Sequence, residues 1–132
     1  MTFRDVILET KAYGYGKLQA NAQQLGHGIR AALHAKGFES VAAEGWKSPT
    51  VVVCYMRSPK DADMLAKFKA QGLQLAAGVP LKIDEPWMSA DGGIAAGKPP
   101  TFRVGLFGLD KLKDVPLAIK TFEDALDAAC KL

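Results

Sequence analysis

Arg103 is the residue of this sequence whose type and surroundings point most directly to chemistry. It lies in the stretch Thr101–Leu112, whose middle has the alternation typical of a β-strand. The spacing places Phe102, Val104 and Leu106 on one face of that strand and leaves Arg103 on the opposite face. A guanidinium stays charged, and its planar fork matches a carboxylate in a bidentate pair. The stretch therefore predicts a site for a small carboxylate; the alternative is a surface arginine beside an acidic neighbour.

Small residues near this arginine could leave room for a ligand. Gly105 follows Arg103 on the same face, and a glycine inside a strand often marks close approach by a ligand or another backbone. A further predicted strand, Leu73–Val79, contains Ala76-Ala77-Gly78. Those small residues are equally compatible with a surface that faces substrate and with packing against a neighbouring helix.

The histidines and cysteines give weaker signals. His27 and His34 lie seven residues apart on a predicted helix, whereas metal-binding pairs on helices lie four apart. We therefore expect two partly exposed histidines and no metal site. Cys54 lies in an apolar strand with no histidine partner that can be read from the sequence, so we expect a core residue, not a nucleophile.

A glycine-rich loop between Asp84 and Pro100 matches the motif of a phosphate-binding loop only in part. Gly92, Gly97 and Lys98 have the required spacing, but Pro99 occupies the position where serine or threonine must bind magnesium. We therefore expect no nucleotide site in this loop. A loop of this length in a compact domain is often functional or mobile.

The arginine strand resembles part of a known enzyme family. Residues 102–108, Phe-Arg-Val-Gly-Leu-Phe-Gly, followed by Asp110-Lys111, are similar to the last strand and turn of class V, fold-type-I aminotransferases of the alanine-glyoxylate and serine-glyoxylate (serine-pyruvate) group. Residues 41–45, 48–53 and 72–80 match further segments in the family's order. Together these segments cover nearly the whole chain, but only the C-terminal third of such an enzyme. The loop before the arginine strand is longer here than is usual in the family.

The resemblance implies a role for Arg103 and a cofactor located elsewhere. In the family, the matching arginine binds the α-carboxylate of the amino-acid or oxo-acid substrate. The lysine that forms the Schiff base with pyridoxal phosphate precedes this region, in the large domain, and neither Lys82 nor Lys111 matches it. The resemblance therefore implies no catalytic and no cofactor-binding residue in this chain. We expect a fragment of a longer enzyme that is inactive alone and binds no cofactor.

The full enzyme would transfer an amino group from alanine or serine to a small 2-oxo acid, glyoxylate or pyruvate. Its other partners would be the missing N-terminal large domain and a second subunit in a homodimer. A detached domain should expose an apolar patch where those partners were. The alternative function is a stand-alone α+β module that binds a small ligand or another protein, without catalysis.

The predicted fold is α+β: a small, mainly antiparallel sheet of about four strands with helices packed on one face. Helices are predicted over Thr2–Thr10 and Lys17–Lys36, after Ser58, and after Asp114, which is a good N-cap. Strands are predicted at Phe38–Ala43, Thr50–Met56, Leu73–Val79 and around Arg103, and Thr50–Met56 reads as a central strand covered on both faces or nearly so. We expect residues 1–16 to be a helix and hinge left from an interdomain helix, and residues 17–132 to be a single domain.

Composition limits the remaining possibilities. The chain has 132 residues, is 48% hydrophobic, and carries a net charge of +3, too mild to imply a nucleic-acid partner. No apolar run approaches the roughly 20 residues of a membrane helix, and charged residues interrupt the N-terminus where a signal peptide would be apolar. With only two cysteines and no membrane segment, we expect a cytoplasmic protein.

Overall fold

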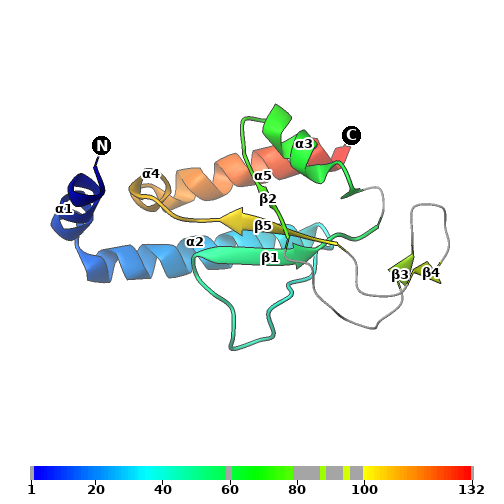
Figure 1. The fold of residues 1–132 in the computed structure, drawn as a ribbon, viewed down its shortest axis with the longest axis horizontal. Coiled ribbons are helices and arrows are strands. Elements are labelled where there is room, and N and C mark those ends of the chain that lie inside the picture. The colour runs from blue at the N-terminus through cyan, green and yellow to red at the C-terminus, as the bar shows by residue number, and fades with distance from the viewer. Residues whose placement is uncertain (1, 59–60, 79–86, 89–93, 96–99, 132) are drawn as a thin grey trace.

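A computed structural model describes residues 2–58, 61–78, 87–88, 94–95 and 100–131 of the chain. The order of elements in these residues is α1 (Phe3–Tyr13), α2 (Tyr15–Ala35), β1 (Val51–Tyr55), α3 (Met64–Ala70), β2 (Ala76–Ala77), β3 (Trp87–Met88), β4 (Ile94–Ala95), β5 (Thr101–Gly105), α4 (Leu109–Leu112) and α5 (Val115–Lys131). Figure 1 shows α2 and α5 side by side along the sheet. The class is α+β, as the sequence predicts.

The main sheet has three antiparallel strands in the order β1-β5-β2. The central strand is thus β5, which carries Arg103, and not β1 as the sequence suggested. Burial along β1 alternates, with Val52 and Cys54 buried and their neighbours only partly so. The expectation that Thr50–Met56 is covered on both faces is therefore wrong, because helices cover one face only.

The fourth strand expected at Phe38–Ala43 does not form as a regular element. One bridge joins Ser40 to Cys54, and two backbone hydrogen bonds of 2.9 Å accompany it: Val41 N to Val53 O and Tyr55 N to Glu39 O. The segment therefore follows β1 briefly and then turns away. This is why the sheet has three described strands instead of about four.

Other elements differ in length from expectation. The strand predicted at Leu73–Val79 is reduced to β2, and the short helix α4 was not predicted. In the expected loop Asp84–Pro100, β3 and β4 pair as a second antiparallel sheet. The loop's remaining residues before Pro100, with Gly92, Gly97 and Lys98, lie outside the described residues, as does Lys82.

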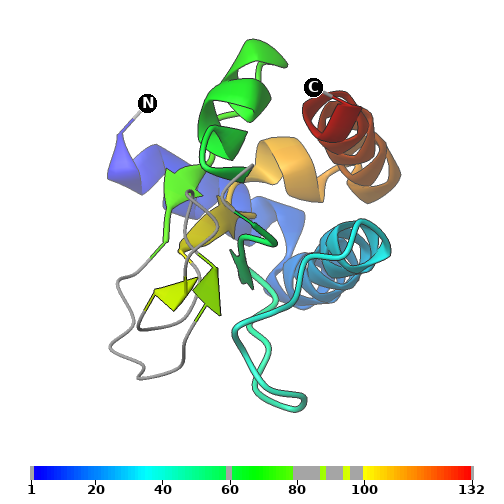
Figure 2. The same cartoon turned by 90° about the vertical axis from the view of Figure 1, so that its right-hand side faces the viewer.

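The core lies between the sheet and the helices, which Figure 2 shows on one side of the strands. Phe102 and Val104 are buried from β5, as the alternation predicts. Phe38 and Phe102 meet edge to face at 5.4 Å between ring centroids, and Phe68 and Phe122 stack at the same separation. The first pair joins the segment after α2 to the central strand, and the second joins α3 to α5.

Helices α1 and α2 are separated at Gly14, whose φ of 100° few other residues adopt. This break falls within residues 1–16, the segment expected to form a helix and hinge. That this segment acts as a hinge remains a prediction. α1 contributes no buried residue, and its Phe3 side chain is 81% exposed. Tyr13 Oη and Asn21 Nδ2 donate to Leu112 O at 3.1 and 2.7 Å, so the helix junction is tied to α4 by hydrogen bonds.

Gly26 marks a close contact between α2 and the segment before β1. A Cβ atom at this position would lie 2.6 Å from Pro49 O and 3.0 Å from Pro49 Cα, which are backbone atoms that cannot rotate away. The helix can therefore approach this turn only because residue 26 has no side chain.

Gly26→Ala should destabilise the protein by about 1–3 kcal/mol, although alanine is the better helix former by about 1 kcal/mol. Urea unfolding measures the difference. Gly16→Ala is the matched control, because no atom lies within 4 Å of its added Cβ. It should leave stability unchanged or raise it by up to about 1 kcal/mol. Equal effects of the two substitutions would contradict the close contact at Pro49.

Asp61 is buried, at 3% exposure, and its carboxylate is held by Arg57. Arg57 donates from Nε and its backbone N to Oδ2 at 2.9 and 2.8 Å, and from Nη2 to Oδ1 at 2.7 Å. The same guanidinium donates to Lys36 O at 2.9 Å and lies 4.1 Å from the ring centroid of Phe38. The Arg57–Asp61 ion pair therefore joins the end of α2, the end of β1 and the residues just before α3.

This ion pair should make the free energy of unfolding depend on pH in the acidic range. Burial opposes ionisation of Asp61, but hydrogen bonds and charge from Arg57 outweigh it and hold the pKa of this carboxyl below its usual value. A carboxyl whose pKa is lowered in the folded state stabilises the protein at pH values above its unfolded-state pKa of about 3.9. This stabilisation is lost as the pH falls toward the folded-state pKa.

Asp61→Asn should therefore lower the free energy of unfolding at pH 7 by about 2–4 kcal/mol, with the gap to the parent protein closing below about pH 4. Denaturant unfolding at several pH values measures this gap. Asp124→Asn removes an exposed ion pair with Lys120 and should change stability by less than about 0.5 kcal/mol. A gap between parent and Asp61→Asn that stays constant down to pH 2 would exclude the ion pair as its cause.

Candidate functional site

Arg103 lies on the face of the sheet that the helices leave uncovered. In the antiparallel register it is directly opposite Val53 of β1 and Ala76 of β2, and cross-strand partners project from the same face. Arg103 and Ala76 are exposed, while Val53 is partly buried. The side chain on which the predicted carboxylate site depends is therefore open to solvent in this chain.

One hydrogen bond orients the Arg103 side chain. Its Nε donates to Ala77 O at 2.8 Å, which ties the guanidinium to the neighbouring strand β2. Within the described ranges, neither Nη1 nor Nη2 has a hydrogen-bond partner, and no carboxylate forms an ion pair with Arg103. Among these residues, two parallel donors therefore have no partner, and the acidic neighbour of the alternative interpretation is not found.

The two glycines near Arg103, Gly105 and Gly78, have different structural explanations. A Cβ at Gly105 would meet only Phe107 ring carbons, at 3.5 and 3.6 Å, which is ordinary contact, so the backbone leaves this position open. A Cβ at Gly78 would collide with Thr101, whose carbonyl accepts a 2.7 Å hydrogen bond from Gly78 N. Gly78 is thus required by close approach of β5, which is neither of the two explanations considered from the sequence.

A hollow of about 360 Å³ lies next to Val53, the residue of β1 directly opposite Arg103, although Arg103 itself does not line it. Val53 and Thr101 line it from the strands, while Val41 and Trp46 line it from the segment before β1. Its walls are mostly apolar side chains. A carboxylate held by Arg103 would therefore have an apolar surface beside it.

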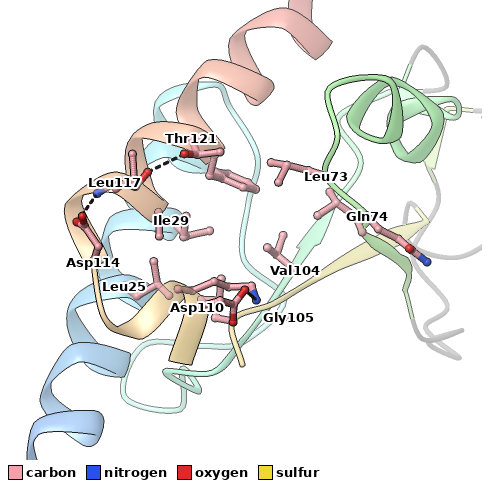
Figure 3. A pocket seen from close by; sticks show the side chains of 15 residues that line it. Leu25, Ile29, Leu73, Gln74, Val104, Gly105, Asp110, Asp114, Leu117 and Thr121 are labelled. Atoms are coloured by element: carbon pink, nitrogen blue, oxygen red, sulfur yellow. Dashed lines mark hydrogen bonds and ion pairs between the residues drawn. The ribbon is translucent and has the colours of Figure 1, made fainter. Parts of the chain in front are cut away.

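A second cavity, of about 460 Å³, lies on the opposite side of the sheet (Figure 3). Val104 faces it from β5, Leu25 and Ile29 from α2, and Leu73 from the segment after α3. Arg103 does not line it, so the predicted binding residue and this cavity are separated by the strand itself.

The polar groups of the cavity in Figure 3 already have partners. Asp114 Oδ1 accepts from Leu117 N at 3.1 Å, which confirms the predicted N-cap of α5, and Thr121 Oγ1 donates to Leu117 O at 2.8 Å. Asp110 pairs with Lys111 at 2.8 Å. These interactions stabilise α4 and α5, and they leave the cavity an apolar space with an engaged polar rim.

The remaining candidate residues have structural explanations. Burial raises the pKa of the Cys54 thiol to about 11, so it stays protonated at neutral pH, as expected of a core residue. His27 and His34 are exposed, and no group of three or more possible metal ligands occurs in the part of the chain that the structure describes. Lys111 Nζ donates to Phe107 O as well as to Asp110, so this lysine is engaged.

Sequence reasoning did not single out Arg30 and Ser40, which line a third cavity with His27 and His34. A usable signal was present, because residues 27, 30 and 34 recur at the spacing of one helix face. Their significance depends on a segment that folds back over α2, which helical spacing alone does not reveal.

The sequence matches no model of a known protein family, and no curated protein sequence is significantly similar to it. The aminotransferase resemblance therefore depends on the motifs around Arg103 and upstream of it. No helix in the described residues is long and apolar enough to cross a membrane.

Proposed function

We propose that this chain is the C-terminal small domain of a class V aminotransferase and that Arg103 binds the substrate carboxylate. The observation that carries the proposal is the Arg103 guanidinium, oriented by Ala77 O on the uncovered face of the central strand, with neither Nη group paired among the described residues. A bidentate Arg–carboxylate pair needs two such parallel donors.

In this proposal, the chain positions the substrate and does not carry the chemistry. Arg103 fixes the α-carboxylate, Gly105 leaves room beside it, and the hollow next to Val53 accommodates a small side chain. The donors would be alanine or serine, and the acceptors glyoxylate or pyruvate. Holding a substrate in one orientation is a major source of rate enhancement in enzymes.

Neither Lys111 nor Lys47 is suited to hold pyridoxal phosphate. Lys111 donates to Asp110 and to Phe107 O, and Lys47 forms an ion pair with Glu44. The proposal therefore places the cofactor on a large domain outside these 132 residues, and no step through the cofactor follows from this chain.

The alternative is a stand-alone module that binds a small ligand or another protein. The apolar cavity of Figure 3 favours it, because ligand pockets are mostly apolar with a few polar groups. The genomic reading frame before residue 1 separates the two functions. An upstream domain with a Schiff-base lysine supports the aminotransferase, and its absence supports the module.

Arg103→Ala in the intact enzyme should raise KM for both substrates, corresponding to a loss of about 2–4 kcal/mol for a charged bidentate contact. Steady-state kinetics with each substrate measures this loss. Arg4→Ala is the matched control, because Arg4 is an exposed arginine of α1, and it should leave KM unchanged. Gly105→Ala should fold normally, so a rise in its KM would report on ligand approach. Unchanged kinetics in Arg103→Ala would exclude the role.

Pyridoxal phosphate added to the 132-residue chain should give no specific adduct after borohydride reduction. The reason is that neither Lys82 nor Lys111 matches the lysine that forms the Schiff base in the family. Mass spectrometry of tryptic peptides measures modification at each lysine. Low, dispersed labelling is the expected result, whereas stoichiometric labelling of one lysine would overturn the assignment of the cofactor to another domain.

A further inference from the structure

The Arg103 side chain crosses the edge strand β2 to reach its hydrogen-bond acceptor. Gly78 N donates to Thr101 O at 2.7 Å, so the N–H of Gly78 points toward β5. In a trans peptide the N–H and the carbonyl of the preceding residue point in opposite directions. The Ala77 carbonyl therefore points away from β5, toward the outer edge of the sheet. Arg103 Nε donates to this oxygen at 2.8 Å, so the side chain must pass over β2.

Ala76 lies beneath the path of the Arg103 side chain. It is directly opposite Arg103 in the antiparallel register, and the Cβ atoms of such partners lie about 4.5–5.5 Å apart on the same face of the sheet. Ala76 is exposed, so packing of the core does not require a small side chain there. A larger side chain at this position would instead occupy the space that the Arg103 side chain crosses.

The two cross-strand neighbours of Arg103 differ in size. On the side of β1 the opposite residue is Val53, which is β-branched and partly buried, whereas on the side of β2 it is Ala76. A branched side chain on one side and a methyl group on the other favour the direction that the Arg103 side chain takes, across β2.

The hydrogen bond to Ala77 O has a consequence for ligand binding. A guanidinium is planar, so fixing Nε also fixes the directions of Nη1 and Nη2. A side chain that is ordered before a ligand arrives loses less conformational entropy when the ligand binds. The anchored Arg103 should therefore bind a carboxylate more tightly than a freely rotating arginine would.

We propose that Ala76 is a positioning residue of the carboxylate site. Its small side chain lets Arg103 lie across β2 and donate to Ala77 O, which orients both Nη groups in the free chain. Ala76 acts through Arg103 and does not touch the ligand. The identity of the ligand rests on the proposed function, whereas the orientation of Arg103 is a property of the chain without any ligand.

The first test compares the order of the Arg103 guanidinium in three forms of the 132-residue chain: the parent, Ala76→Val and Ala77→Val. Valine favours strands and both positions are exposed, so both variants should fold. Ala77→Val is the matched control, because it retains the accepting carbonyl and successive side chains of a strand point to opposite faces. Thermal unfolding checks that the three proteins have similar stability.

NMR relaxation of ¹⁵N-labelled Arg103 Nε measures this order. The Nε–H should be ordered in the parent and in Ala77→Val, and mobile in Ala76→Val. Equal order in Ala76→Val and the parent would overturn the proposal, and so would a mobile Nε–H in the parent.

The second test is a titration of the same proteins with acetate at constant ionic strength, followed at Arg103 Nε. Ala76→Val should bind acetate about fivefold more weakly than the parent and Ala77→Val, which corresponds to ordering one flexible side chain on binding. Equal affinity in the three proteins would refute the positioning role while leaving the carboxylate site intact. No saturable shift in the parent would instead contradict the carboxylate site, and the relaxation of Nε would still decide whether Ala76 positions Arg103.

Discussion

The alternation of side chains along β5 is the constraint on which most of this structure depends. β5 has a partner strand on each side, so its backbone groups are committed to the sheet and its side chains can point only toward the helices or away from them. Phe102 and Val104 occupy the helical side and are buried. Arg103, placed between them, must project from the other face. One strand therefore separates the core from the candidate binding face without an additional element.

Local sequence patterns were sufficient to predict the elements whose signals are local. Helix α2, the Asp114 cap of α5 and the burial of Cys54 were predicted because each depends on residues within a few positions along the chain. The elements that were missed depend on distant residues. Phe38–Ala43 has strand-forming residues, but only one bridge to β1 forms before the segment turns away. The role of Asp61 also depends on tertiary contacts, because its partner Arg57 binds Lys36 O as well.

The same distinction applies to the candidate sites. The exposure of Arg103 could be predicted from alternation, but its anchor at Ala77 O could not, because 26 residues separate the two in sequence. Arg30 and Ser40 were missed for a similar reason. Arg30 binds carbonyl groups 18 and 21 residues away. The cavity that Arg30 and Ser40 line exists only where the segment between α2 and β1 folds back on α2. Composition cannot reveal a polar atom that becomes buried in this way.

The glycine between the first two helices has a mechanical consequence. α1 buries no residue, so reorienting it about the two backbone dihedrals of Gly14 would require no repacking of the core. The resistance to such a reorientation comes from the hydrogen bonds of Tyr13 Oη, which donates to Leu112 O and accepts from Asn21 Nδ2, and from an exposed ion pair between Glu9 and Lys113. Exposed ion pairs of this kind are weak, so the ion pair between Glu9 and Lys113 would add little to the free-energy cost of reorienting α1. A polypeptide joined ahead of α1 would therefore be connected flexibly to the sheet that carries Arg103.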